Sequence, residues 1–167
     1  MSEAERATWR VRAATAQSML DQLYKDGTLS YANVFSSSSA AAKHVLGAIG
    51  PISLSPEVGL EIGGFLFNTG ENWSYAVPMI GLSGSMPQMV NVPAGAGGGY
   101  HTHPGSGSAN FSINDTGWVA ATKMPLYVWG SGEIRVCKIG AASCNFEIAR
   151  RMGHFTISRG RQGEVVP

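Results

Sequence analysis

Residues 101–115 read HTHPGSGSANFSIND and bring two histidines, a serine and an aspartate into one short stretch. His101 and His103 are two residues apart, so on an extended strand both imidazoles point to the same face and can converge on one ion. Asp115 lies where a new element should begin, and its carboxylate can supply a third ligand while a fourth position stays open for water. The stretch therefore predicts a metal site at which chemistry can take place.

The same stretch predicts the start of a helix. Ser112 has the side chain of an N-cap, and residues 118–121 continue the helix. The other aspartates of the chain, Asp21 and Asp26, belong to an earlier predicted helix and its end. Because a His-x-His pair also occurs on surfaces without metal, the predicted site depends on Asp115 joining the histidines.

Strand and turn patterns flank this stretch and predict a sheet. Residues 60–67 form a strand candidate, and residues 73–77 are its expected hairpin partner. Further strands are predicted at residues 125–129, 134–137 and 145–148. Residues 81–99 are rich in Gly, Ser, Pro and Met and predict a long loop, which usually serves a site or a lid. Its glycines are no phosphate loop, because the GK[ST] ending and the following helix are missing.

Two helices are expected before the sheet. Residues 3–25 form the first, and residues 40–49 form the second, which Gly50-Pro51 should end. We divide the chain into residues 1–35 as an N-terminal helix or linker, residues 36–155 as one domain, and residues 156–167 as a flexible tail.

Composition excludes several classes of protein. Only 14% of the 167 residues are charged and the formal net charge is +1, so no electrostatic footprint for nucleic acid or an anionic membrane stands out. No apolar run approaches the roughly 20 residues that cross a bilayer, and no conventional export signal is visible. We therefore expect a soluble protein without a signal peptide.

Several apolar and sulfur-containing residues have two interpretations. Cys137 and Cys144 flank a hairpin connection and could form a disulfide in an oxidising compartment, but we favour two buried thiols. Met79, Met86 and Met89 either line a substrate groove or pack the long loop. Trp118 is assigned to the core.

Glu61 is the candidate for a catalytic base. A hydrolytic metal site needs a group that takes a proton from the attacking water and returns it to the leaving amine. Glu61 lies in an otherwise apolar strand, just before Gly63-Gly64, where missing side chains let another strand or a ligand approach closely. The alternative is a solvated glutamate at the sheet edge.

Together these residues resemble the motif of the JAB/JAMM (MPN-domain) zinc metalloproteases. The matching parts are Glu61 with Gly64, the run from His101 to Pro104, and Ser112-x-x-Asp115. More narrowly, about residues 36–140 resemble the JAB-like domain attached to bacterial polymorphic and Rhs-type toxins. The segment between the second histidine and the aspartate is one residue longer here than is typical of the family.

The resemblance implies an α/β fold of the α+β type, with a mixed, largely antiparallel sheet flanked by helices across residues 36–155. It implies that His101, His103 and Asp115 hold Zn²⁺ and that Glu61 is the base. Ser112 would hydrogen-bond the oxyanion of the tetrahedral intermediate, with a simple N-cap as the alternative.

The implied function is a zinc-dependent metallopeptidase or isopeptidase acting on a peptide, protein or isopeptide substrate. The further partners are a cognate immunity protein or a larger parent toxin, and the protein would stay in the bacterial cytoplasm or leave through a specialised secretion system. The alternatives are a non-catalytic domain of the same fold and a cupin-like metal-binding domain. Zinc deaminases are excluded, because the His-x-Glu and Pro-Cys-x-x-Cys elements are missing.

Overall fold

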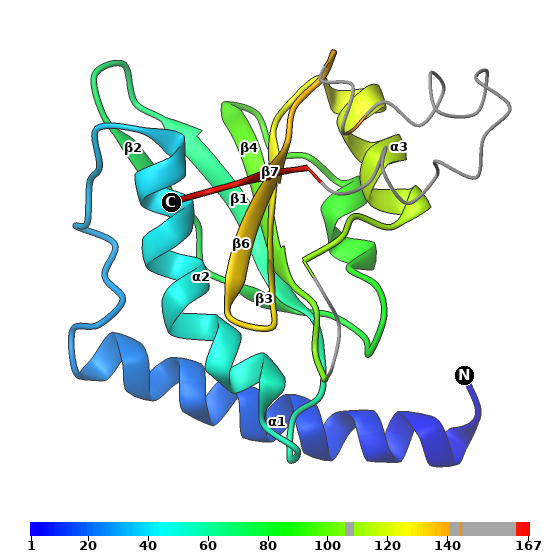
Figure 1. Ribbon diagram of the computed structural model, residues 1–167. Coiled ribbons are helices and arrows are strands. Elements are labelled where there is room, and N and C mark those ends of the chain that lie inside the picture. The colour runs from blue at the N-terminus through cyan, green and yellow to red at the C-terminus, as the bar shows by residue number, and fades with distance from the viewer. Residues whose placement is uncertain (106–108, 141–143, 145–162) are drawn as a thin grey trace, which may run out of the picture.

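The computed structural model describes residues 1–105, 109–140, 144 and 163–167 (Figure 1). The helices are α1 (Glu3–Lys25), α2 (Ser38–Leu54) and α3 (Ile113–Thr122), with a 3-10 helix η1 (Pro87–Val90). The strands are β1 (Ile62–Asn68), β2 (Trp73–Tyr75), β3 (Met79–Ile80), β4 (Ala96–Thr102), β5 (Leu126–Gly130), β6 (Glu133–Cys137) and β7 (Glu164–Val165). The expected α+β class is confirmed. No helix in the described part of the chain has both the length and the apolar character to span a membrane.

The strands form one sheet in the order β2-β1-β4-β5-β6-β7, and β3 pairs with β1 beside this path. β4 and β5 are parallel, with α3 between them in the chain, and the remaining pairs are antiparallel. β2 and β3 thus lie along one edge of the sheet, where both pair with β1, and β7 forms the other edge. The described strands thus make an open sheet, unlike the closed barrel that a cupin-like domain requires.

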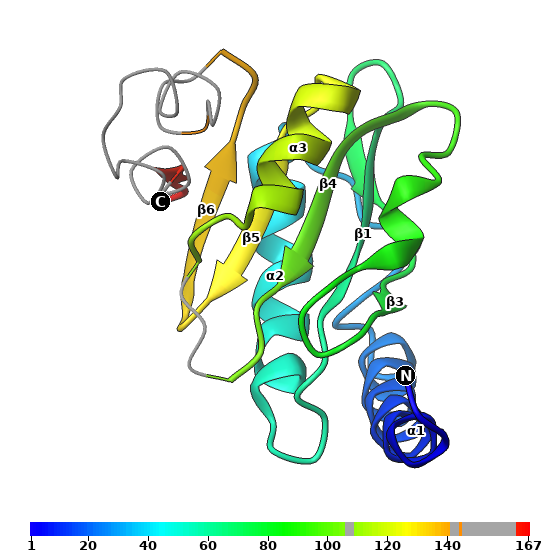
Figure 2. The ribbon, with the colours of Figure 1, turned by 90° about the vertical axis from the view of Figure 1, so that its right-hand side faces the viewer.

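Side chains that alternate along the strands divide the core into two layers. In β5, Tyr127 and Trp129 join the cluster that contains the buried residues of α2. Leu126 and Val128 join the cluster that contains Val119 of α3. Because successive residues of a strand point to opposite faces, α2 covers one face of the sheet and α3 the other (Figure 2).

α1 has the bounds predicted for it and lies across one end of the sheet and of α2 (Figure 1). A capping box between Ser2 and Glu5 begins the helix. Ala16 and Leu20 are buried in the same cluster as α2, and so is Leu29, just after the helix. Residues 1–35 therefore share a core with the rest of the chain, while the domain boundary at residue 35 stays a prediction.

α2 is longer than the sequence predicts. It begins after Ser37, whose side chain accepts the Ala40 N–H, and it continues through Gly50-Pro51 to Leu54. The glycine has a different role, because a Cβ at residue 50 would lie 2.4 Å from the Trp129 ring. Gly50 permits close packing of α2 on the sheet and does not end the helix.

The predicted loop at residues 81–99 is also corrected. β4 already starts at Ala96, so the glycine run belongs to a strand that pairs with β1. A Cβ at Gly99 would lie 2.7 Å from Met89 and 2.9 Å from the Trp118 ring. The strand has the glycine-rich composition of a loop because bulky side chains pack over it and leave no room for larger residues at these positions.

The described end of the chain adds an edge strand where the sequence predicts a flexible tail. β7 pairs with β6, and the Val166 N–H donates to the Ile134 carbonyl at 2.8 Å. An edge strand offers unpaired backbone groups, and β7 satisfies those of β6. Cys137 and Cys144 form a disulfide with Cα atoms 5.4 Å apart, in place of the two thiols that we favoured. The strand predicted at residues 145–148 lies outside the described residues.

Candidate metal centre

The side chains of His101 and His103 lie on the same face of the sheet, and their ring nitrogens come close together. Alternation puts His101 and His103 on the face that α3 covers, and Thr102 on the face that α2 covers. Neighbouring strands fix this register: Gly63 of β1 pairs with His101, and the His103 N–H donates to the Trp129 carbonyl at 2.8 Å. The Nε2 atoms of the two rings lie 3.2 Å apart. The predicted convergence of the imidazoles is present in the structure.

Gly63 allows β1 to approach the histidine strand closely. A Cβ at residue 63 would lie 2.3 Å from the Tyr100 carbonyl oxygen and 2.6 Å from Cβ of His101. These are backbone and near-backbone atoms that no side-chain rotation can move away. The close approach brings the chain around Glu61 next to the histidines.

Asp115 completes the group from α3. Its Oδ1 lies 3.3 Å from Nε2 of His101, and its Oδ2 lies 3.6 Å from Nε2 of His103. A capping box orients the carboxylate: the Ser112 N–H donates to Oδ2 at 2.7 Å, and the Asp115 N–H donates to the Ser112 hydroxyl at 3.1 Å. The extra residue in the preceding segment leaves Asp115 within reach of both rings.

The distances among these three side chains are of the size found between metal ligands. Ligands at about 2.0–2.1 Å from a tetrahedral zinc ion lie about 3.3–3.4 Å from one another. The two ring nitrogens are 3.2 Å apart, and the Asp115 carboxylate reaches them with different oxygens, Oδ1 at 3.3 Å and Oδ2 at 3.6 Å. Two imidazole nitrogens and a carboxylate are also donors that zinc prefers. The donor atoms gathered here are therefore compatible with a metal ion.

Glu61 lies beside the histidines and is 7% exposed, which is against a solvated edge glutamate. The carboxylate of Glu61 and the ring nitrogens of His101 and His103 lie within 4.8 Å of one another. Its backbone pairs on one side with the segment after β3, since the Glu61 N–H donates to the Leu82 carbonyl and the Gly81 N–H donates to the Glu61 carbonyl, both at 2.8 Å. The buried Glu/His/His group is compatible with a metal ion.

Burial changes the protonation of the site. It raises the pKa of Glu61 to about 7, an effect that His103 opposes and Asp115 reinforces. Burial lowers the pKa of His101 to about 4, so this ring is neutral near pH 7 and can offer a nitrogen lone pair to a cation. Burial alone would raise the pKa of Asp115, but the histidines and the Ser112 N–H hold that pKa below its ordinary value.

Ser112 acts as the N-cap of α3, as the sequence predicts, and it is exposed at the cleft. Its hydroxyl accepts the Asp115 N–H, which leaves the hydroxyl hydrogen available to a ligand. The N-cap and a contact with substrate are therefore compatible.

A cleft of about 780 Å³ opens beside the site. Glu61, His101, Ser112 and Asp115 line one part of it. Much of the remaining lining is apolar and comes from the segment around η1, from α3 and from β5: Met86, Pro87, Met89, Val90, Ile113, Trp118, Ala121 and Leu126.

The sequence assigns Trp118 to the core, but in the structure this residue also lines the cleft. It is half-buried, lines the cleft, and donates its indole N–H to the Met89 carbonyl at 2.8 Å. The signal in the sequence is its spacing, because a residue three positions after Asp115 on a helix lies on the same side. Met86 and Met89 line the cleft, in agreement with the groove interpretation, whereas Met79 is not among its lining residues and packs against the core layer under α3.

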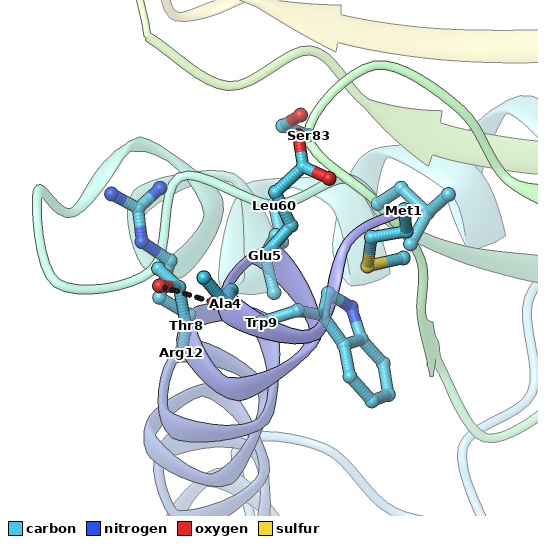
Figure 3. A pocket seen from close by; sticks show the side chains of 9 residues that line it. Met1, Ala4, Glu5, Thr8, Trp9, Arg12, Leu60 and Ser83 are labelled. Atoms are coloured by element: carbon cyan, nitrogen blue, oxygen red, sulfur yellow. Dashed lines mark hydrogen bonds between the residues drawn. The ribbon is translucent and has the colours of Figure 1, made fainter.

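A second cavity, of about 590 Å³, lies away from these histidines, between the first half of α1 and residues 60, 82 and 83 (Figure 3). Trp9 and Leu60 contribute apolar walls, and Glu5 and Arg12 are the charged residues among those described around it. Its described lining contains no histidine or cysteine. We therefore place the candidate site in the first cleft.

Comparisons of the chain with protein-family models, with curated proteins and with solved structures found no match.

Proposed function

We propose that this protein is a zinc-dependent metallopeptidase or isopeptidase of the JAB/JAMM type. One observation carries the proposal: the Nε2 atoms of His101 and His103 lie 3.2 Å apart, one oxygen of Asp115 lies 3.3 Å from the first ring and the other lies 3.6 Å from the second, and a buried glutamate stands beside them. The resemblance to toxin-associated JAB-like domains adds a secreted bacterial effector, with a cognate immunity protein or parent toxin, as the biological setting.

The chemistry divides between the ion and the chain. A bound zinc ion supplies Lewis acidity, which makes a water molecule acidic near neutral pH and polarises a carbonyl. Glu61 takes a proton from the attacking water and delivers it to the leaving amine, a role that suits a buried carboxyl beside the two histidines. Ser112 donates its hydroxyl hydrogen to the oxygen that gains negative charge. Asp115 has two roles: it belongs to the capping box that begins α3, and its carboxylate would be a ligand of the ion.

The cleft supports a peptide or protein substrate. Its volume of about 780 Å³ exceeds what a single small acyl group needs, and its apolar lining from Met89, Trp118 and Leu126 suits side chains of a polypeptide. The titratable residues of its described lining are Glu61, His101 and Asp115, so binding would depend on shape and apolar contact more than on salt bridges.

A second candidate is a non-catalytic metal-binding domain of the same fold. The observation behind it is that the Glu61 carboxylate lies within 4.8 Å of both histidine ligand atoms, so Glu61 could itself fill the fourth position. In that case Glu61 would contribute to metal affinity and no position would stay open for water.

The substitution Glu61→Gln separates the two candidates. The zinc-loaded wild-type protein and E61Q are incubated with a proteome-derived peptide mixture, and new termini are identified by mass spectrometry while zinc affinity is measured by competition with a chelator. A peptidase in which Glu61 is the base loses cleavage in E61Q by at least about 100-fold and keeps its zinc affinity. Full activity of E61Q contradicts the base, and a loss of zinc affinity without any wild-type cleavage favours the non-catalytic domain.

A further inference from the structure

Thr102, between the two histidines, takes part in a buried chain of hydrogen bonds that starts and ends on either side of Glu61. The Thr102 hydroxyl accepts the Ile62 N–H at 3.0 Å and donates to Oγ of Ser53 at 2.7 Å. The Ser53 hydroxyl in turn donates to the Leu60 carbonyl at 2.8 Å. Thr102 and Ser53 are both fully buried. Each hydroxyl in this chain donates once, so all three bonds can exist together.

The fold explains why these two residues meet. Thr102 points away from the histidine face of β4 toward α2, and Ser53 lies in the last turn of that helix. The register of β1 with β4 ends at the pair Gly63 and His101, so the next N–H, that of Ile62, finds its acceptor in a side chain. The two hydroxyls therefore connect β4 to residues 60–62 just beyond the last backbone pair of β1 and β4.

The opposite side of Glu61 is fixed by the backbone alone. Its N–H and carbonyl are bonded to Leu82 and Gly81, each at 2.8 Å. Gly81 and Leu82 thus hold Glu61 from the β3 side. On the β4 side, the hydroxyl chain is a polar connection between residues 60–62 and the strand carrying His101 and His103, next to the strand pair of Gly63 with His101.

We propose that Thr102 and Ser53 are positioning residues that hold Glu61 at its working distance from the two histidines. The inference rests on the proposed function and extends it: Thr102, between the two histidines, positions the Glu61 side chain through hydrogen bonds to the backbone on either side of residue 61. Misplacement of a reacting group by about 1 Å can cost about 100-fold in rate, so a small shift of residue 61 is enough to matter. Hydrogen bonds in a buried network are strong and directional, which suits them to this task.

The simpler alternative is that Thr102 only satisfies a buried N–H and stabilises the fold. The substitutions Thr102→Val and Thr102→Ser separate the two roles, because valine keeps the shape and loses the hydroxyl, and serine keeps the hydroxyl. The matched control is Tyr127→Phe, which removes another hydroxyl between the sheet and α2, bonded to Ser38 at 2.8 Å and Ser39 at 3.0 Å at the far end of that helix.

The experiment measures three quantities for each variant: zinc content, the hydrogen-exchange rate of the Ile62 amide by NMR, and kcat and KM on the peptide that the wild-type protein cleaves fastest. In T102V we expect full zinc content, Ile62 exchange at least about 10-fold faster, and kcat at least about 10-fold lower with KM within about two-fold. T102S should restore both values, and Y127F should leave kcat and Ile62 exchange within about two-fold of wild type.

Three results would overturn the inference while leaving the proposed function intact. They are unchanged Ile62 exchange in T102V, a kcat of T102V within about two-fold of wild type, and a T102S variant as slow as T102V. A wild-type protein that cleaves no peptide would instead remove the proposed function, and the positioning role with it.

Discussion

The burial of Glu61 predicts how the stability of the zinc-free protein changes with pH. The pKa of Glu61 is about 7 in the folded protein, against 4.5 for an ordinary glutamate. Between these two pH values the folded state holds a proton that the unfolded chain has lost. The stabilisation from this group is therefore complete below pH 4.5 and is lost as the pH rises through 7. At about 1.4 kcal/mol for each pH unit, the loss amounts to about 3 kcal/mol.

His101 works in the opposite direction in the same range. Its pKa falls from 6.5 to about 4 on folding, so its contribution is complete above pH 6.5 and is lost as the pH falls toward 4. In the wild-type protein the two effects largely offset each other between pH 4.5 and 6.5. The Glu61→Gln substitution removes only one of them, so the difference between E61Q and wild type isolates the glutamate.

The assay is urea unfolding of zinc-free wild type and E61Q in a chelator, followed by tryptophan fluorescence at several pH values from 4.5 to 8. The free energy of unfolding of E61Q should rise relative to wild type by about 3 kcal/mol across this range. Glu57→Gln is the control, because the Ser55 hydrogen bond lowers the pKa of Glu57 below 4.5, so the difference between E57Q and wild type should stay nearly constant from pH 4.5 to 8. A difference between E61Q and wild type that stays constant with pH would refute the reasoning.

Two further substitutions test other parts of the site. Gly63→Ala should destabilise the protein by about 2–3 kcal/mol in urea unfolding, because its Cβ would meet the Tyr100 carbonyl at 2.3 Å, whereas Gly84→Ala, with nothing within 4 Å, should have little effect. Equal stabilities of these two variants would contradict the close approach of β1 and β4. Ser112→Ala should lose about 1 kcal/mol of stability with the N-cap, and kcat should fall about 100-fold or more if the hydroxyl also stabilises the oxyanion. A stability loss with unchanged kcat would leave Ser112 as a cap only.

The sequence predicts the ligand geometry well because local rules govern it. Two histidines in an i, i+2 relation on a strand share a face whatever the rest of the fold does. Ser112 and Asp115 form a capping box that depends on four consecutive residues. Each pattern carries its own geometry, so only the approach of α3 to β4 remained for tertiary structure to decide.

The errors arise where packing overrides local propensity. Gly50 and Gly99 resemble a helix end and a loop, but they are small because Trp129 in one case and Met89 with Trp118 in the other occupy the space. No local pattern reveals which distant side chain will lie over a glycine. The bond between Thr102 and Ser53 is hidden for the same reason, since the two residues are far apart in the chain and meet only when α2 packs on the sheet.

If His101, His103 and Asp115 form a zinc site, the purified protein should hold zinc in a way that depends on these side chains. Wild type and His103→Ala are exposed to equal zinc, passed through gel filtration, and measured by inductively coupled plasma mass spectrometry. We expect about one zinc per wild-type chain and a loss of most of it in H103A, with both proteins folded by circular dichroism. Equal zinc content in the two proteins would mean that His103 holds no zinc.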